Sequence, residues 1–216
     1  MKVTKLGHCC LILEPKEGIK IMTDPGADTF VEMRFKENAR NIGAILITHE
    51  HQDHLHIDSV KTILENNPNA IVITNSAVGK LLNEVGVTYK KVEEGETYDI
   101  NGVKVTGFGN LHAEIYESYG RVQNTGYMID SLCCPGDAFE NPKTKVDILA
   151  LSVTGPWMRI KDAISYAKEI KPRIVFPVHD AHIQNWAAFI WRVPENLLEQ
   201  DGISFKKLEL GKEENL

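Results

Sequence analysis

Long apolar runs are missing from this chain. None reaches the roughly 18 residues that a bilayer-spanning helix needs. Residues 1–8 also lack the apolar core and the small-residue cleavage site of a signal peptide. The rest of the composition, 43% hydrophobic and 25% charged residues, is typical of a soluble globular protein. We therefore expect a cytoplasmic protein with no membrane partner.

Positive charge is also scarce. The chain has 24 Lys and Arg residues against 30 Asp and Glu residues, and its formal net charge is −6. Its basic residues are scattered, whereas proteins that bind nucleic acids usually carry a clustered basic face. A whole-chain sum does not exclude a local patch, but the balance favours a small-molecule substrate over a nucleic-acid partner.

Cysteine is limited to two adjacent pairs, Cys9-Cys10 and Cys133-Cys134. Neither pair has CxxC spacing, and a reducing compartment keeps such residues as thiols. Both pairs lie in apolar, strand-like segments, which favours buried structural thiols. A role near Asp137 stays open for the second pair, because it precedes that residue by three or four positions.

Histidine, in contrast, is concentrated in one short segment. Directly after the apolar run 44–47 come His49, His51, Asp53 and His54. Imidazole and carboxylate are ligands that suit zinc and neighbouring divalent metals. On a strand His49 and His51 point the same way, and a following turn would carry Asp53 and His54 to a second position. The spacing fits two adjacent metal ions better than one, or than a solvated His-rich tract.

Further residues of metal-ligand type follow other predicted strands, where active sites on α/β scaffolds tend to lie. They are Asp24, His112, Asp137 and His179. Pro25 predicts an extended conformation for Asp24 and the end of its strand. Each histidine alone fits a core or surface imidazole, but their shared placement at strand ends indicates one site. His56 is expected to be a surface residue at a helix start.

The hydrophobic pattern predicts strands and helices in alternation. The expected strands are 2–6, 9–14, 19–23, 44–48, 70–74, 88–92, 96–100, 103–108, 126–129, 131–134, 146–153, 173–178 and 204–210. The expected helices are 57–66, 76–85, 160–170 and 185–192. Asn101-Gly102 predicts a type I′ hairpin turn, and 27–43 a loop over the site. This order predicts an α/β chain of two similar halves in an αββα sandwich, with 1–216 as a single domain.

The motif His49-x-His51-x-Asp53-His54 after an Ile/Leu-rich strand resembles the signature of the metallo-β-lactamase-fold hydrolases. The resemblance covers nearly all of the chain and includes the Gly136-Asp137 pair. It is closer to the small single-domain hydrolases related to ascorbate-6-phosphate lactonases than to the antibiotic-degrading enzymes. It implies the four-layer αββα metallo-β-lactamase fold.

The resemblance also implies roles for individual residues. The first metal ion would be held by His49, His51 and His112, and the second by Asp53, His54 and His179, with Asp137 between them. Asp24 would support a ligating histidine. His8, in the element Leu6-Gly7-His8, would support the site from nearby. Separately from the resemblance, the position of His182 three residues past His179 suggests contact with the substrate or a metal-bound group.

The function implied is that of a metal-dependent hydrolase with two divalent ions, zinc or alternatively manganese or iron. A metal-bridged hydroxide would attack a lactone, ester, amide or phosphodiester, with Asp53, Asp137 and His182 as catalytic residues. One alternative is a nuclease of the same fold, which should need a basic face or an added domain. Another is a metal-binding protein without turnover, although such members usually lack ligands. Pro156-Trp157 departs from the subgroup and leaves the substrate open.

An apolar stretch follows the last expected site residues. Helical spacing places Trp186, Phe189 and Ile190 on one face, with Trp191 to the side. This face is expected to pack on the core, to form a contact in a homo-oligomer, or to make an apolar wall beside the metals.

Overall fold

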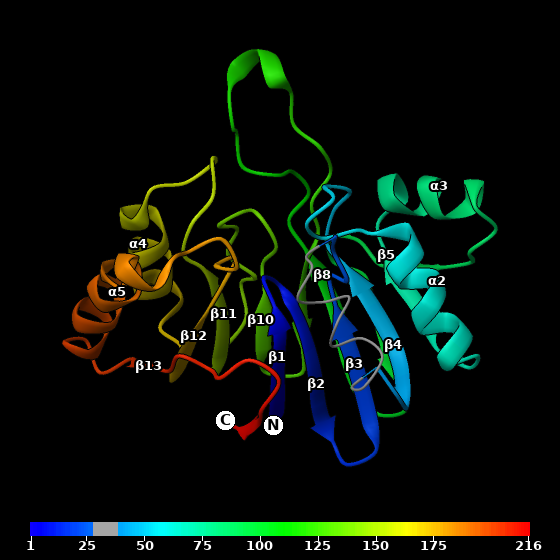
Figure 1. Ribbon diagram of the computed structural model, residues 1–216, viewed down its shortest axis with the longest axis horizontal. Helices are drawn as coiled ribbons and strands as arrows, with labels where there is room; N and C mark the ends of the chain where they lie inside the picture. Colours follow the sequence, from blue (N-terminus) through cyan, green and yellow to red (C-terminus); the bar gives the residue numbers. More distant parts are fainter. Residues whose placement is uncertain (28–38) are drawn as a thin grey trace.

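The computed structural model of the protein describes residues 1–27 and 39–216 (Figure 1). The loop predicted over 27–43 therefore lies largely outside the described residues. Two sheets lie face to face in the middle of the molecule, with helices on both outer sides (Figure 1). Within the described ranges, no helix has the length and apolar character to cross a membrane.

The first sheet has the strand order β14-β1-β2-β3-β4-β5-β6. Its strands are β1 (Lys2–Gly7), β2 (Cys10–Lys16), β3 (Ile19–Thr23), β4 (Ile42–Ile47), β5 (Ile71–Thr74), β6 (Lys90–Lys91) and β14 (Glu213–Asn215). β3, β4 and β5 are parallel neighbours, and β1 runs in the same direction because β2 is antiparallel to both β1 and β3. β6 is parallel to β5 as well, so five strands of this sheet end at the same edge.

The second sheet has the order β13-β12-β11-β10-β9-β8-β7. Its strands are β7 (Thr97–Ile100), β8 (Val103–Phe108), β9 (Gly126–Ile129), β10 (Leu132–Cys134), β11 (Ile148–Ser152), β12 (Ile174–Val178) and β13 (Ser204–Phe205). β10, β11, β12 and β13 are parallel. At the β7–β8 hairpin, Asn101 and Gly102 have φ values of 52° and 91°, as the predicted type I′ turn requires.

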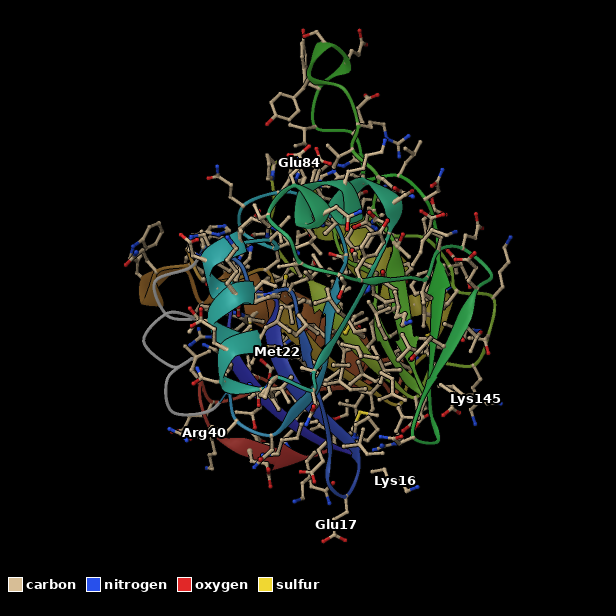
Figure 2. All side chains as sticks on the ribbon, turned by 90° about the vertical axis from the view of Figure 1, so that its right-hand side faces the viewer. Lys16, Glu17, Met22, Arg40, Glu84 and Lys145 are labelled. Atoms are coloured by element: carbon tan, nitrogen blue, oxygen red, sulfur yellow. The ribbon has the colours of Figure 1, made fainter. Side chains whose placement is uncertain are left out.

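Three apolar layers hold the four-layer sandwich together. Alternate residues of the strands, such as Leu13 and Leu46 in the first sheet and Val105 and Phe176 in the second, fill the space between the sheets. The other face of the first sheet packs on α2 (Ile57–Asn66) and α3 (Ser76–Glu84). In Figure 2 the buried Met22 lies beside α2, while Lys16 and Glu17 lie at the tip of the β2–β3 hairpin.

The second sheet is covered by α4 (Ile160–Ile170) and α5 (Phe189–Glu199). With helices on both outer faces, the predicted four-layer αββα sandwich is confirmed. The extent of the domain, 1–216, stays a prediction.

The tail differs from the prediction. α5 runs through Pro194 and ends at Glu199, because Trp191, Pro194 and Leu198 all lie on its buried face. A short 3₁₀ turn at Asn185–Ala187 precedes it. The predicted strand 204–210 is confined to Ser204–Phe205, and the chain then crosses to the first sheet as β14, beside β1. The two termini meet there (Figure 1), where the amino group of Met1 donates to the carbonyl of Leu216 at 3.1 Å.

The aromatic side chains of the tail distinguish between the alternatives that the sequence left open. Trp191 is buried, with 8% of its surface exposed, and its Nε1–H donates to Asp180 Oδ2 at 3.1 Å. Trp186 and Phe189 are instead exposed, by 81% and 56%. Trp191 is therefore the aromatic residue of the tail that packs in the core. Trp186 and Phe189 form an exposed apolar face beside it.

Trp191→Ala should lower the free energy of unfolding by about 3–5 kcal/mol, because it removes a buried aromatic ring. Trp186→Ala, the matched control on the exposed side, should stay within about 0.5 kcal/mol of the parent protein. Urea unfolding of both variants checks this. Equal losses in the two variants would contradict the assignment of Trp191 to the core.

A long connection between β8 and β9, residues 111–123, projects from the sandwich and is called the arm below (Figure 1). A 3₁₀ turn at Glu117–Tyr119 forms its tip. At its base Leu111 bridges Gln123, and the N–H of His112 donates to the carbonyl of Val122 at 3.0 Å. His112, an expected ligand, is therefore held at the foot of the arm.

The side chain of Glu93 connects the foot of the arm with the start of α3 by hydrogen bonds. Its Oε1 accepts from the backbone N–H of Ser76, from Ser76 Oγ and from Gln123 Nε2, at 2.9, 2.5 and 2.9 Å. The hydrogen bond from the Ser76 hydroxyl is the largest influence on this carboxylate, and together these bonds lower the pKa of Glu93 to about 2. The carboxylate therefore joins the start of α3 to the arm.

Because the pKa of Glu93 is lower in the folded chain than its ordinary value of 4.5, its contribution to stability is present above that value. The contribution should be lost as the pH falls toward about 2. Glu93→Gln should remove this part of the pH dependence, and the exposed Glu94→Gln should keep it. Thermal melting of both variants and the parent between these pH values measures it. A parent–variant difference that stays constant with pH would count against the network.

Candidate metal centre

The expected site residues converge at one edge of the two sheets, each just beyond a strand end. His8 follows β1, Asp24 follows β3, and the segment His49–His54 follows β4. In the second sheet His179 follows β12, and Asp137 lies three residues after β10. The convergence follows from topology, since the strands concerned run in the same direction within each sheet.

The side chains form two groups of potential ligands. In one group, atoms of His49, His51 and His112 all lie within 4.8 Å of one another. In the other, the same holds for His8, Asp53, His54 and His179. The tight turn after β4 separates them, with the N–H of His54 and of Leu55 both donating to the carbonyl of His51 at 2.9 and 2.8 Å.

Asp137 contacts both groups. Its Oδ2 lies 3.5 Å from His112 Nε2 and 4.0 Å from His49 Nε2. The same carboxylate lies 3.0 Å from His179 Nε2 and 3.3 Å from His54 Nε2. With only 2% of its surface exposed, Asp137 occupies the buried space between the two histidine groups.

Several ligand-type atoms have no hydrogen-bond partner among the residues that the structure describes. They are Nε2 of His49, His54, His112 and His179, Nδ1 of His179 and Oδ1 of Asp137. Leaving buried polar atoms unpaired is costly, and these atoms are surrounded by one another rather than by apolar groups. The donor set of imidazole nitrogens and carboxylate oxygens therefore fits divalent cations at this position.

Hydrogen bonds at the opposite ring nitrogen turn three of the imidazoles inward. His54 Nδ1–H donates to Asp24 Oδ2 at 2.9 Å, and His112 Nδ1–H donates to the carbonyl of Ala113 at 2.6 Å. The Thr48 hydroxyl donates to Asp24 Oδ2 at 3.0 Å, so it accepts from His49 Nδ1–H, also at 3.0 Å. Such partners fix the ring and leave Nε2 available to a metal.

Three residues of the site adopt left-handed backbone conformations that only glycine adopts easily. The φ values are 42° for His8, 38° for Asp24 and 59° for His179. The prediction that Pro25 keeps Asp24 extended is thus wrong. The backbone of Asp24 is instead held by Leu46, and its side chain accepts from the backbone N–H of Thr48 at 2.8 Å. Backbone strain of this kind concentrates at functional sites.

A comparison of the sequence with known protein families identifies the family of this chain. The model of the family described as Beta-lactamase superfamily domain matches residues 2–179 of this chain. The chain belongs to the β-lactamase superfamily.

Relatives within this superfamily agree with that assignment. The Mycobacterium tuberculosis protein Rv0786c is 33% identical over 187 residues, 84% of each chain. The UPF0173 metal-dependent hydrolase Ta0764 of Thermoplasma acidophilum is 26% identical over 190 residues, 83% of each chain. Igni18, a metallo hydrolase from Ignicoccus hospitalis, shares the fold with a TM-score of 0.74 at 19% identity, over 98% of this chain and 96% of its own. The chain is therefore a metal-dependent hydrolase of the β-lactamase fold. Its placement beside the lactonase-like proteins stays a prediction.

The pKa values of the histidines in this β-lactamase-fold hydrolase are shifted in different directions. Burial lowers the pKa of His49 well below its ordinary value, and burial also lowers the pKa of His51. Burial acts in the same direction on His179, but the carboxylates of Asp137 and Asp53 outweigh it and raise the pKa of His179 to about 9. Since a ligating imidazole must be neutral, a cation at the second group competes with a proton there.

The expectation that His49 and His51 point the same way because they lie on a strand is wrong. Both lie in the turn beyond β4, which ends at Ile47, and not on a strand. Their rings nevertheless approach to 4.8 Å between centroids. His112 closes this group, with its ring 4.6 Å from that of His51.

His182 and His56 stand apart from the ligand groups of the described residues. His182 is exposed at the rim, and its ring centroid lies 6.3 Å from that of His179. Thr154 Oγ1 donates to the carbonyl of His179 at 2.7 Å, so it accepts from His182 Nε2–H, also at 2.7 Å. His56 contacts Ser59 at the start of α2, as expected for a helix-start residue.

Two residues near the metal centre carried only weak signals in the sequence. Cys9 Sγ lies within 4.8 Å of ligand atoms of His54 and Asp137, although nothing in the doublet Cys9-Cys10 distinguishes one thiol from the other. The buried ring of Trp157 lies 5.9 Å from the ring of His112 and 6.1 Å from that of His179. The unusual Pro156-Trp157 pair was the only indication of this contact.

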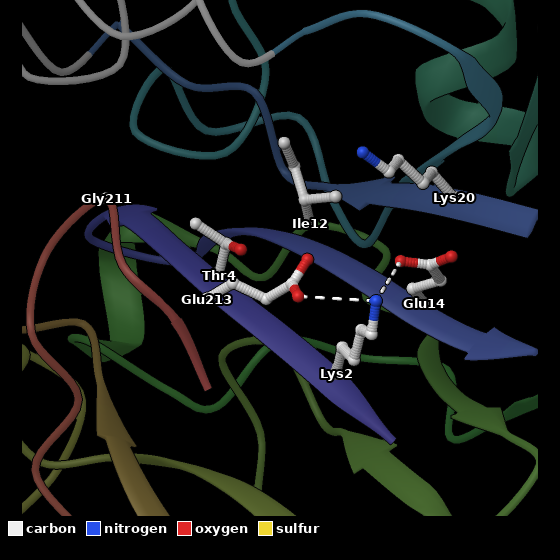
Figure 3. Close-up of a pocket in the computed structure, with 7 residues that line it drawn as sticks. All are labelled: Lys2, Thr4, Ile12, Glu14, Lys20, Gly211 and Glu213. Atoms are coloured by element: carbon white, nitrogen blue, oxygen red, sulfur yellow. Dashed lines mark ion pairs between the residues drawn. The ribbon is translucent and has the colours of Figure 1, made fainter. Parts of the chain in front are cut away.

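A separate hollow of about 140 Å³ lies on the outer face of the first sheet (Figure 3). Lys2 bridges Glu14 and Glu213 there, with Nζ–Oε distances of 3.6 and 3.3 Å. None of the residues that line this hollow belongs to a ligand group of the described chain. The hollow therefore lies apart from the metal centre.

Asp137→Ala should reduce metal affinity and activity more than Asp24→Ala. Asp137 contacts both ligand groups, whereas Asp24 only orients His54, and loss of such a supporting partner costs roughly 10–100-fold. Competition with a chromogenic chelator measures affinity, and melting temperatures show whether each variant folds. Equal and mild effects from both changes would show that Asp137 is misassigned.

Proposed function

We propose that the chain binds two divalent ions and hydrolyses a lactone, ester, amide or phosphodiester bond in a small substrate. One ion is held by His49, His51 and His112, the other by Asp53, His54 and His179, with Asp137 shared. The observation that carries this proposal is the position of Asp137, whose oxygens lie 3.0–3.5 Å from Nε2 atoms of both groups. Zinc is the first expectation for a site of imidazole and carboxylate ligands, with manganese and iron as alternatives.

When bound, such ions lower the pKa of a water molecule, polarise the substrate oxygen and stabilise the leaving oxygen. Asp53 is the carboxylate suited to orient that water and accept its proton, because its side chain is 44% exposed while its Oδ2 lies 3.4 Å from His179 Nε2. Asp137 is nearly closed to solvent and acts by holding the two groups at a fixed separation.

His182 is the residue suited to proton exchange with the substrate. Because its Nε2–H is used by Thr154, the other ring nitrogen, Nδ1, is left as the atom that accepts or releases a proton. Its exposed place on the rim supports contact with a substrate that enters from solvent. No serine or cysteine nucleophile is needed by this arrangement.

The walls of the centre favour a substrate with an apolar part. The ring of Trp157 closes one side, and a side chain added at Gly155 would approach its Nε1 to 2.6 Å, so only glycine leaves room for the indole. On another side a cavity of about 220 Å³ adjoins His8, with Ile183, Trp191 and Leu208 in its lining. Lys5, Asp180 and Lys207 also line this cavity, and its small size supports a small molecule as the substrate.

Purified protein loaded with zinc should hold close to two ions per chain by elemental analysis. His51→Ala should remove mainly one of them, because His51 belongs to a single group, and the control His56→Ala should remove none. A panel of lactones, esters, amides and phosphodiesters should then yield turnover that a chelator abolishes and added metal restores. Protein that binds no metal would overturn the proposal, and metal binding without any turnover would favour a binding protein.

A further inference from the structure

We propose that His8 is itself a ligand of the second ion, rather than a residue that supports the site from nearby. This inference rests on the proposed function, because it assigns a further donor to the second of its two ions. The assignment adds the imidazole that directly follows β1 of the first sheet to the group of Asp53, His54 and His179.

The distances between donor atoms carry this inference. His8 Nε2 lies 3.2 Å from Asp53 Oδ2, and His179 Nε2 lies 3.4 Å from the same oxygen. His54 Nε2 lies 3.9 Å from it. Ligand bonds of about 2.0–2.2 Å to one ion, at the angles of a tetrahedral or five-coordinate site, separate neighbouring donors by roughly 2.8–3.8 Å. His8 is therefore as close to Asp53 Oδ2 as the two histidines already assigned, and the ligand atoms of all four residues lie within 4.8 Å of one another.

The backbone around His8 is built to present the ring to this position. The residue is 6% exposed and has a left-handed φ of 42°. Its carbonyl accepts from the backbone N–H of His179 at 3.2 Å, and the two rings lie 4.0 Å apart between centroids. One hydrogen bond thus fixes His8 and His179 relative to each other across the junction of the two sheets.

A buried ion pair strengthens the same junction. Lys5, in β1, is 3% exposed, and its Nζ donates to Asp180 and to the carbonyl of Pro177. Asp180 directly follows His179, and Lys5 lies three residues before His8. The pair therefore holds the ends of β1 and β12 together next to both imidazoles.

A simpler role for His8 would be to donate a hydrogen bond to Asp53. The same Nε2 cannot donate to a carboxylate and bind a metal, so the two roles exclude each other. Asp53 Oδ2 lies 3.4 Å from His179 Nε2, and the carboxylate is partly open to solvent, so Asp53 has other partners without His8. A buried imidazole in a strained conformation, grouped with three other ligands, is better explained as a ligand.

Cobalt(II) loading of the chelator-stripped protein tests the assignment. Each ligating imidazole that keeps an N–H should give one strongly shifted, solvent-exchangeable proton resonance. His8→Gln retains an amide N–H for Asp53 but lacks the imidazole. It should lose one such resonance and weaken one of the two cobalt-binding events by at least about tenfold. The control His56→Ala should keep every resonance and both affinities.

Retention of every resonance and of both affinities in His8→Gln would overturn the ligand assignment while leaving the two-ion site intact. A parent protein that binds only one cobalt ion would overturn this inference together with the proposed function. If His8→Gln does not fold, the parent protein with ¹⁵N-labelled histidine and ¹¹³Cd gives the answer. Coupling between cadmium and His8 Nε2 supports the assignment, and its absence contradicts it.

Discussion

The structure depends on one constraint, the convergence of buried imidazoles and carboxylates at the edge where the two sheets meet. His49 and His54 are fully buried, and Asp137 is nearly so. In an apolar interior, unpaired polar groups of this kind oppose folding. Bound metal ions would resolve the conflict, since they would satisfy the inward nitrogen and oxygen atoms at once. Metal binding and the stability of the fold would then be linked.

The strands hold the site residues in fixed positions, and the strained backbone conformations lie in the short loops that follow the strands. The three apolar layers hold the strands, and the turns beyond them accept left-handed conformations at His8, Asp24 and His179. Close backbone approach adds to the precision. A side chain at Gly26 would lie 1.9 Å from the carbonyl oxygen of Asp53, so glycine is required for that loop to pass. Rigid strands thus position reactive side chains that the loops carry.

Much of this arrangement could be predicted from the sequence. The alternating and continuous apolar runs indicated most strands, and the spacing after residue 47 indicated two ligand groups. These features are local, because they depend on neighbouring residues alone.

The features that escaped prediction are non-local. The pairing of β14 with β1 joins the two ends of the chain, and no local pattern marks it. α5 continues through Pro194 because its buried face packs on the second sheet. Asp24 leaves the extended conformation favoured before proline because Thr48 binds its carboxylate. Tertiary contacts override local preference in each case. Cys9 and His8 likewise acquire their place near the ligands only when the sheets meet.

Anomalous diffraction from crystals grown with zinc is the most direct test of the two-ion centre. Data on either side of the zinc absorption edge should show two peaks at the junction of the sheets. One peak should lie among His49, His51 and His112 and the other among Asp53, His54 and His179, with the carboxylate of Asp137 between them. A single peak, or peaks away from Asp137, would contradict this account of the site.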